Sequence, residues 1–166
     1  MGIFAKFFII ANIITMKFGL TIPTIIMLFT ACNGPSTGDE DTVKQDIISF
    51  AQAYFNYDFK HALKYCTPES DKWIKYAASN IHEADLELLR EQDEGADVDL
   101  DDLEFSDNDS TGIAVVTVEN YMRLDTIGNA GRMIDRATFR IPIVLRDTRW
   151  LIKMEDLPRS EKSSRD

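Results

Sequence analysis

The sequence has few of the side chains that hold metals or form cross-links. Its 166 residues include two cysteines and two histidines. Cys32 belongs to the N-terminal segment discussed below, so Cys66 is the one cysteine in the body of the chain, where a lone thiol usually behaves as a small buried hydrophobe. His61 and His82 are far apart, and no second histidine follows His82 at the spacing of a zinc-binding helix. We therefore expect no metal site and no internal disulfide.

Motifs for cofactors and for nucleophilic catalysis are also missing. The sequence contains no glycine-rich phosphate loop and no Gly-x-Ser-x-Gly pattern. The segment 107–112 starts like a calcium loop, with acids at its first and third positions and glycine at its sixth. Its twelfth position, however, is Val118, where such a loop needs a glutamate. We expect a hairpin turn here and no cofactor.

Positive charge is scarce. Eighteen Lys and Arg stand against 28 Asp and Glu, which gives a net charge of −10. Without residues 1–31, which hold two bases and no acid, 16 bases remain against 28 acids and the net charge is −12. Nucleic acids and anionic lipid surfaces require basic faces, so both are excluded as partners. A protein partner would have to present a basic face.

The first 31 residues contain no acid, and their bases are Lys6 and Lys17. Read from Met16, the segment has a short basic start and an apolar run over 18–31, which ends before Cys32. This run of about 14 residues is too short for a membrane span, which takes about 20. The layout is typical of a secretory signal. We expect Met16 to be the true start and residues 1–31 to be a signal peptide.

The end of this segment, Leu28-Phe29-Thr30-Ala31-Cys32, resembles the lipobox of bacterial lipoproteins, although the family prefers leucine where Phe29 stands. The resemblance implies cleavage before Cys32, a lipid on its thiol, and attachment to the outer membrane of a Gram-negative bacterium, facing either the periplasm or the surface. Residues 32–41 would then be a flexible tether. A plain signal or an uncleaved anchor remains the alternative.

Helical spacing follows the tether. Apolar residues recur at intervals of three and four over 42–65, which predicts one long helix. Thr67-Pro68 should end it and start a second helix, with Thr67 as the cap. A third helical segment is expected over 81–92.

In the C-terminal half of the chain, apolar residues recur at every second position, which is typical of strands. The stretch "VDLDDLEF" suits an acidic edge strand, and strands are expected at 112–124, 136–146 and 148–155, with a short hairpin connection over 146–149. Pro142 lacks a backbone donor, so it belongs at an edge or a bulge. The apolar faces predict a core that includes Phe50, Tyr54, Trp73, Phe139, Ile141, Ile143, Trp150 and Ile152.

Helices followed by antiparallel strands predict an α+β fold in which N-terminal helices pack on a curved sheet of three or four strands. Several residues resemble nuclear-transport-factor-2-like domains, the cone-shaped fold shared with ketosteroid isomerases: Phe50, Asp58, Ala62-Leu63, Thr67-Pro68-Glu69 and the final "WLIKME". The resemblance implies a cone-fold domain over 42–157, with a pocket between helix and sheet. Residues 158–166 are expected to be a disordered tail.

Three functional hypotheses remain open. In the first, the chain is a non-catalytic module that binds a partly apolar small ligand or a protein, with Tyr54, Tyr57 and Tyr121 as amphipathic walls of the pocket. In the second, it is a cone-fold isomerase or hydrolase that uses Asp58 and His61, which are three residues apart on one helix. A buried Asp58 would favour the enzyme, and an exposed Asp58 would count against it. A purely structural envelope protein is a third reading.

Overall fold

The structure is a computed structural model that describes residues 40–124 and 131–161. The expected signal, Cys32 and most of the tether lie outside the described residues. Contacts divide the chain into Met1–Gly34 and Pro35–Asp166. The second unit carries all the described elements and its own hydrophobic core, so we expect it to fold without the first.

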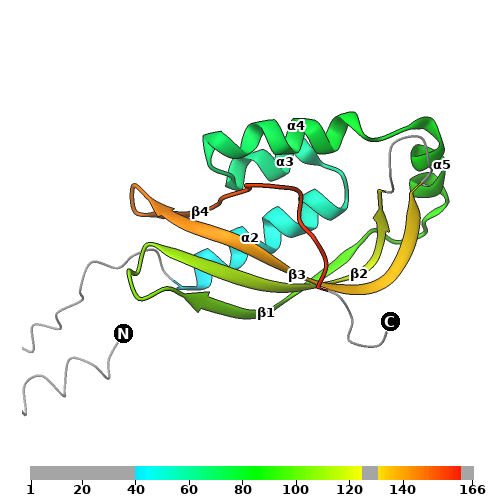
Figure 1. Cartoon of the computed structure of the whole chain (residues 1–166). Helices are drawn as coiled ribbons and strands as arrows, with labels where there is room; N and C mark the ends of the chain where they lie inside the picture. The colour runs from blue at the N-terminus through cyan, green and yellow to red at the C-terminus, as the bar shows by residue number, and fades with distance from the viewer. Residues whose placement is uncertain (1–39, 125–130, 162–166) are drawn as a thin grey trace, which may run out of the picture. The chain divides into compact units, whose positions relative to one another are not determined.

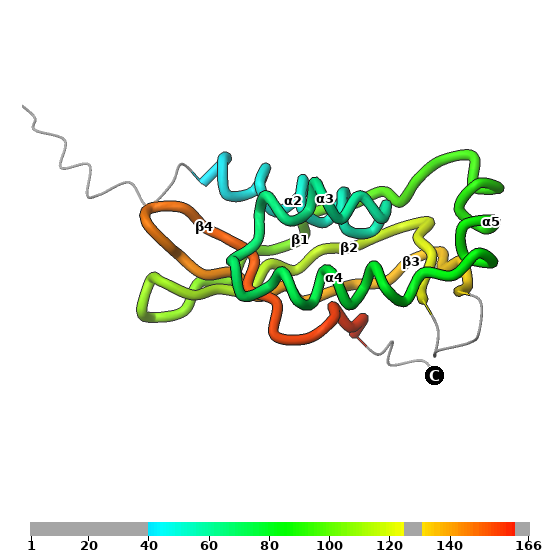
Figure 2. Tube along the Cα trace, turned by 90° about the horizontal axis from the view of Figure 1, so that it is seen from above, coloured from blue at the N-terminus to red at the C-terminus, as the bar shows by residue number. Residues whose placement is uncertain are grey.

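The fold is α+β, as the sequence predicted. Helices precede an antiparallel four-stranded sheet of order β1-β2-β3-β4, and α2, α3 and α4 lie over one face of this curved sheet (Figures 1 and 2). In chain order the elements are α2 (Glu40–Phe55), α3 (Phe59–Ala62), the 3-10 turns Leu63–Tyr65 and Pro68–Ser70, α4 (Asp71–Ser79), α5 (Glu83–Glu91), β1 (Asp97–Phe105), β2 (Thr111–Arg123), β3 (Arg132–Arg146) and β4 (Arg149–Ile152).

The prediction of one long helix over 42–65 is wrong. The helix ends at Phe55, and Tyr57 takes a left-handed backbone with φ of 63°. Asn56 stabilises this break, because its side chain accepts a hydrogen bond from Ala96 N at 2.8 Å and donates one to Ala96 O at 3.0 Å. A contact with the start of β1 therefore interrupts a helix that the local spacing would have continued.

The second helix also starts differently from the prediction. Thr67 makes no side-chain cap; its hydroxyl is 2.9 Å from that of Ser70, and Pro68–Ser70 forms a 3-10 turn before α4. The buried Ser70 hydroxyl donates to Ile152 O and accepts from Met154 N at 2.9 Å. Thr67 N also donates to Ile152 O. The Ser70 side chain and the Thr67 backbone therefore tie the helical layer to the end of β4.

The four predicted strands are present, but β3 starts earlier than predicted, at Arg132, and β4 ends earlier than predicted, at Ile152. β1 is an edge strand, and Asp147 and Thr148 both have positive φ in the two-residue turn between β3 and β4, as hairpin turns of this length require. β4 ends at Ile152, which lies opposite Ile143. The residues of β3 that precede Ile143, including Pro142, therefore do not pair with β4. Pro142 thus occupies a position where its missing donor costs no ladder hydrogen bond.

The core lies between the helices and the sheet. Of the eight residues predicted for it, six are buried: Phe50, Phe139, Ile141, Ile143, Trp150 and Ile152. Tyr54 and Trp73 are half-buried and pack against this cluster at its border.

The chain after β4 returns alongside β3. Lys153 N donates to Pro142 O, and Glu161 N donates to Thr138 O. Ser160 forms an isolated bridge with Phe139. The ordered fold therefore extends to Glu161, four residues past the boundary expected from the sequence, while 162–166 lie outside the described residues. No helix within the described part of the chain is long and apolar enough to cross a membrane.

Candidate functional site

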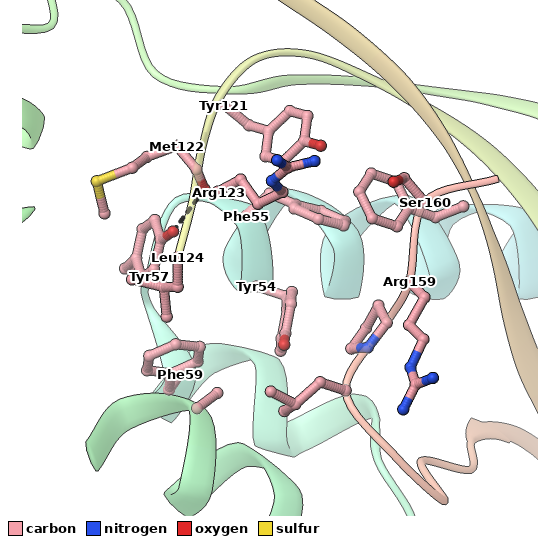
Figure 3. Close-up of a pocket in the computed structure, with 14 residues that line it drawn as sticks. Tyr54, Phe55, Tyr57, Phe59, Tyr121, Met122, Arg123, Leu124, Arg159 and Ser160 are labelled. Atoms are coloured by element: carbon pink, nitrogen blue, oxygen red, sulfur yellow. Dashed lines mark hydrogen bonds between the residues drawn. The ribbon is translucent and has the colours of Figure 1, made fainter. Parts of the chain in front are cut away.

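A pocket of about 300 Å³ lies among the end of α2, the end of β2, the middle of β3, α4 and the C-terminal segment (Figure 3). Most of its wall is aromatic or aliphatic, and its charged side chains are two arginines. The residues that line it are Tyr54, Phe55, Tyr57, Phe59, Ala77, Tyr121, Met122, Arg123, Leu124, Phe139, Leu157, Pro158, Arg159 and Ser160.

The break after α2 builds one side of the pocket. Because the helix ends at Phe55, the chain turns and presents Tyr54, Tyr57 and Phe59 to the same space. The rings of Tyr54 and Phe59 pack edge to face with centroids 5.6 Å apart. Tyr57 donates its hydroxyl to Met122 O at 2.6 Å, which fixes this turn to the end of β2. Burial raises the pKa values of both Tyr54 and Tyr57, so both phenols stay protonated at neutral pH.

Tyr121 reaches the pocket because the alternation of β2 changes at Asn120. Asn120 has φ of 50°, a left-handed conformation that asparagine tolerates. As a result Val118 and Tyr121, three residues apart, both belong to the core. The Tyr121 ring lies 5.5 Å from the rings of Phe55 and Phe139.

The Tyr121 hydroxyl is the unusual polar group of this site. The residue is 2% exposed, and its hydroxyl oxygen is buried with no hydrogen-bond partner among the described residues. Burial raises its pKa, partly offset by the positive charge of Arg123. A buried hydroxyl without a partner is unfavourable. The pocket is therefore lined by a side chain that would gain a hydrogen bond from a suitable occupant.

The pocket brings together the three tyrosines selected from the sequence, Tyr54, Tyr57 and Tyr121. Their role in ligand binding remains a prediction. Sequence reasoning missed Arg123, at the end of β2, and the segment from Leu157 to Ser160. One feature of the sequence could have indicated that this segment packs against the domain: the apolar and rigid pair Leu157-Pro158 after the last strand.

The proposed catalytic pair is not assembled here. Asp58 is exposed, and its carboxylate accepts a hydrogen bond from His61 N at 3.1 Å as the N-cap of α3. The His61 ring stacks on Tyr65, with Nε2 3.1 Å from the Tyr65 hydroxyl. Neither Asp58 nor His61 lines the pocket. Asp58 thus has a structural role that explains its position.

Within the described ranges, no group of three or more histidine, cysteine, aspartate or glutamate side chains could hold a metal ion. Cys66 is buried, and burial raises the pKa of its thiol to about 12, which makes it a poor nucleophile.

Comparison with known proteins adds little to this description. No family model and no curated protein matches the chain. One solved structure, the intermembrane space region of the chloroplast protein ARC6, aligns with 76% of this chain and 98% of its own at 15% identity and a TM-score of 0.43.

Proposed function

We propose that this protein is a lipid-anchored envelope protein that binds a small, partly apolar molecule in the pocket without transforming it. The observation that carries the binding role is the buried, unpartnered hydroxyl of Tyr121 in an aromatic pocket of about 300 Å³. Ligand sites are typically apolar clefts of this size or larger with a few polar groups that fix orientation.

The composition of the pocket supports binding over catalysis. A general base must titrate near the working pH, and the pocket offers no carboxylate, histidine or lysine. Its tyrosines have raised pKa values, so they act as hydrogen-bond donors and not as bases. The exposed position of Asp58 counts against the enzyme that uses Asp58 and His61.

We further propose that the domain is of the nuclear-transport-factor-2-like type. Helices that precede an antiparallel sheet, and a pocket between them, support this assignment. It would be tested by an experimental structure of the domain: a sheet that wraps α2 as a cone would support it, and a flat sheet would contradict it.

The anchor rests on the lipobox-like segment that ends at Cys32. In a Gram-negative host, Cys32→Ser should leave an unprocessed precursor and move the protein out of the detergent phase. Cys66→Ser is the matched control, because Cys66 is buried in the domain. Unchanged mass and partitioning of the Cys32 variant would refute lipidation.

The binding role is tested by filling the pocket. The protein is purified from its host and the small molecules that co-purify are identified by mass spectrometry. Ala77→Leu places extra atoms in the pocket, whereas Ala78→Leu places them on the exposed side of the same helix. We expect the first variant to lose the co-purified molecule and the second to keep it, with both still folded by circular dichroism. Equal retention by the two folded variants would contradict binding in this pocket.

A further inference from the structure

The charge of the pocket is opposite to that of the protein. The chain holds 28 acidic and 18 basic side chains, yet the charged residues that line the pocket are Arg123 and Arg159, with no acid among them. If the charged residues of the pocket had the composition of the whole chain, most of them would be acidic. The charged side chains that line the pocket therefore differ in sign from the net charge of the chain, while the negative charge of the buried Asp85 acts on Tyr57 from outside the lining.

The two arginines enter from separate parts of the fold. Arg123 is the last residue of β2 and is half-buried, and its positive charge acts on the phenol of Tyr121. Arg159 comes from the C-terminal segment, is largely exposed and pairs with Asp156. Within the described ranges no carboxylate forms an ion pair with Arg123. Arg123 is thus the guanidinium best placed to act on an occupant, with Arg159 at the rim.

The groups next to Arg123 complete an amphipathic site. Phe55, Phe139 and Phe59 form the apolar wall, and the unpartnered Tyr121 hydroxyl is a buried donor beside it. Guanidinium and phenol donors both suit an oxyanion, and hydrogen bonds of this charged kind are stronger than neutral ones. An apolar wall with donors at one end suits a molecule with an apolar body and a negatively charged end.

On the basis of the binding function proposed above, we propose that the ligand is a small apolar molecule with one anionic group, such as a carboxylate, whose charged end lies at Arg123 and whose body packs on the phenylalanines. The net charge of −12 left after residues 1–31 repels any anion. A preference for an anion must then come from the local arginines and not from general attraction to the surface.

Two fluorescent probes that differ by one charged group provide the test. The anionic probe is 1-anilinonaphthalene-8-sulfonate, and the neutral one is N-phenyl-1-naphthylamine, which has the same aromatic body. Both are titrated against the unit Pro35–Asp166, which carries its own core and removes the need for detergent. We expect the anionic probe to bind about tenfold more tightly, the factor that corresponds to 1.4 kcal/mol.

Variants and salt locate the cause of this preference. Arg123→Gln should abolish the preference for the anion and leave the affinity for the neutral probe unchanged. Arg123→Lys, which keeps the charge, should retain part of the preference. Arg136→Gln is the control and should change nothing, because Arg136 is exposed, pairs with Glu119 and does not line the pocket; Arg132 is unsuitable because it lies opposite Arg123 in the β2–β3 ladder. Added salt should weaken anion binding, because it screens the attraction to Arg123; general repulsion by the acidic surface would give the opposite trend.

The outcomes separate this inference from the binding function itself. If the neutral probe binds and the anionic probe binds no better, or if Arg123→Gln leaves the preference intact in a folded protein, the anionic ligand is wrong and the binding module stands. If neither probe binds the wild-type unit, both are wrong. Displacement of the anionic probe by 2-naphthoate but not by 2-naphthamide would support the carboxylate; equal displacement would overturn it.

Discussion

Two tyrosines of the pocket should respond to the same substitution with opposite signs. Tyr57 donates its hydroxyl to the carbonyl of the buried Met122 at 2.6 Å. Tyr121 buries its hydroxyl with no partner among the described residues. Tyr→Phe removes the hydroxyl in both cases and keeps the ring packing, so the difference between the variants isolates the hydrogen bond.

The magnitudes follow from the two environments. Tyr57→Phe loses a hydrogen bond and leaves a buried carbonyl without this donor, which should lower the free energy of unfolding by about 1–2 kcal/mol. Tyr121→Phe removes a buried polar group that has no bond to lose, and should raise the free energy of unfolding by about 1 kcal/mol in the ligand-free protein. For a domain of this size, 1 kcal/mol corresponds to about 4 °C in Tm.

Urea unfolding followed by circular dichroism measures both variants, with ligand removed by refolding. A bound ligand that accepts from Tyr121 should reverse the gain, since the wild type alone can donate to it. The reasoning would be refuted if Tyr121→Phe destabilised the ligand-free protein as much as Tyr57→Phe does, because the Tyr121 hydroxyl would then have a partner within the protein.

Three further substitutions test the core, the buried thiol and the helix cap. Ile143→Ala should lower the free energy of unfolding by about 2–5 kcal/mol because Ile143 is fully buried, and a loss below about 0.5 kcal/mol in urea unfolding would place it on the wrong face. Burial raises the pKa of Cys66 from 9.0 to about 12, so the contribution of the thiol to stability is complete below pH 9.0 and is lost as pH rises toward 12. In Cys66→Ala the free energy of unfolding, measured by urea titration, should fall less steeply with pH over this range than in the wild type. The same pH dependence in both proteins would contradict the shift. Asp58→Ala should lower the free energy of unfolding by about 1 kcal/mol because the helix cap is lost, whereas Asp58→Asn should change it little and should leave ligand binding unchanged. Loss of binding in a folded Asp58→Asn protein would show that Asp58 takes part in ligand binding.

Local patterns of apolar residues were enough to predict the class of the fold and most of its core. Burial of one face sets a period of two in a strand and of 3.6 in a helix, so Phe139, Ile141 and Ile143 identify the inner face of β3 without any knowledge of its partners. The β3–β4 turn was equally predictable, because a two-residue hairpin restricts the backbone locally.

The position of the pocket depends on contacts between residues that are far apart in the sequence. The long helix was wrong because Asn56 binds Ala96, 40 residues away, and this contact outweighs local spacing. Simple alternation does not reveal that Tyr121 faces the core, since the left-handed Asn120 interrupts it. Arg123 and the C-terminal segment line the same pocket because that segment pairs with β3 at Phe139. Such pairings join residues that are distant in the chain, and no local period encodes them.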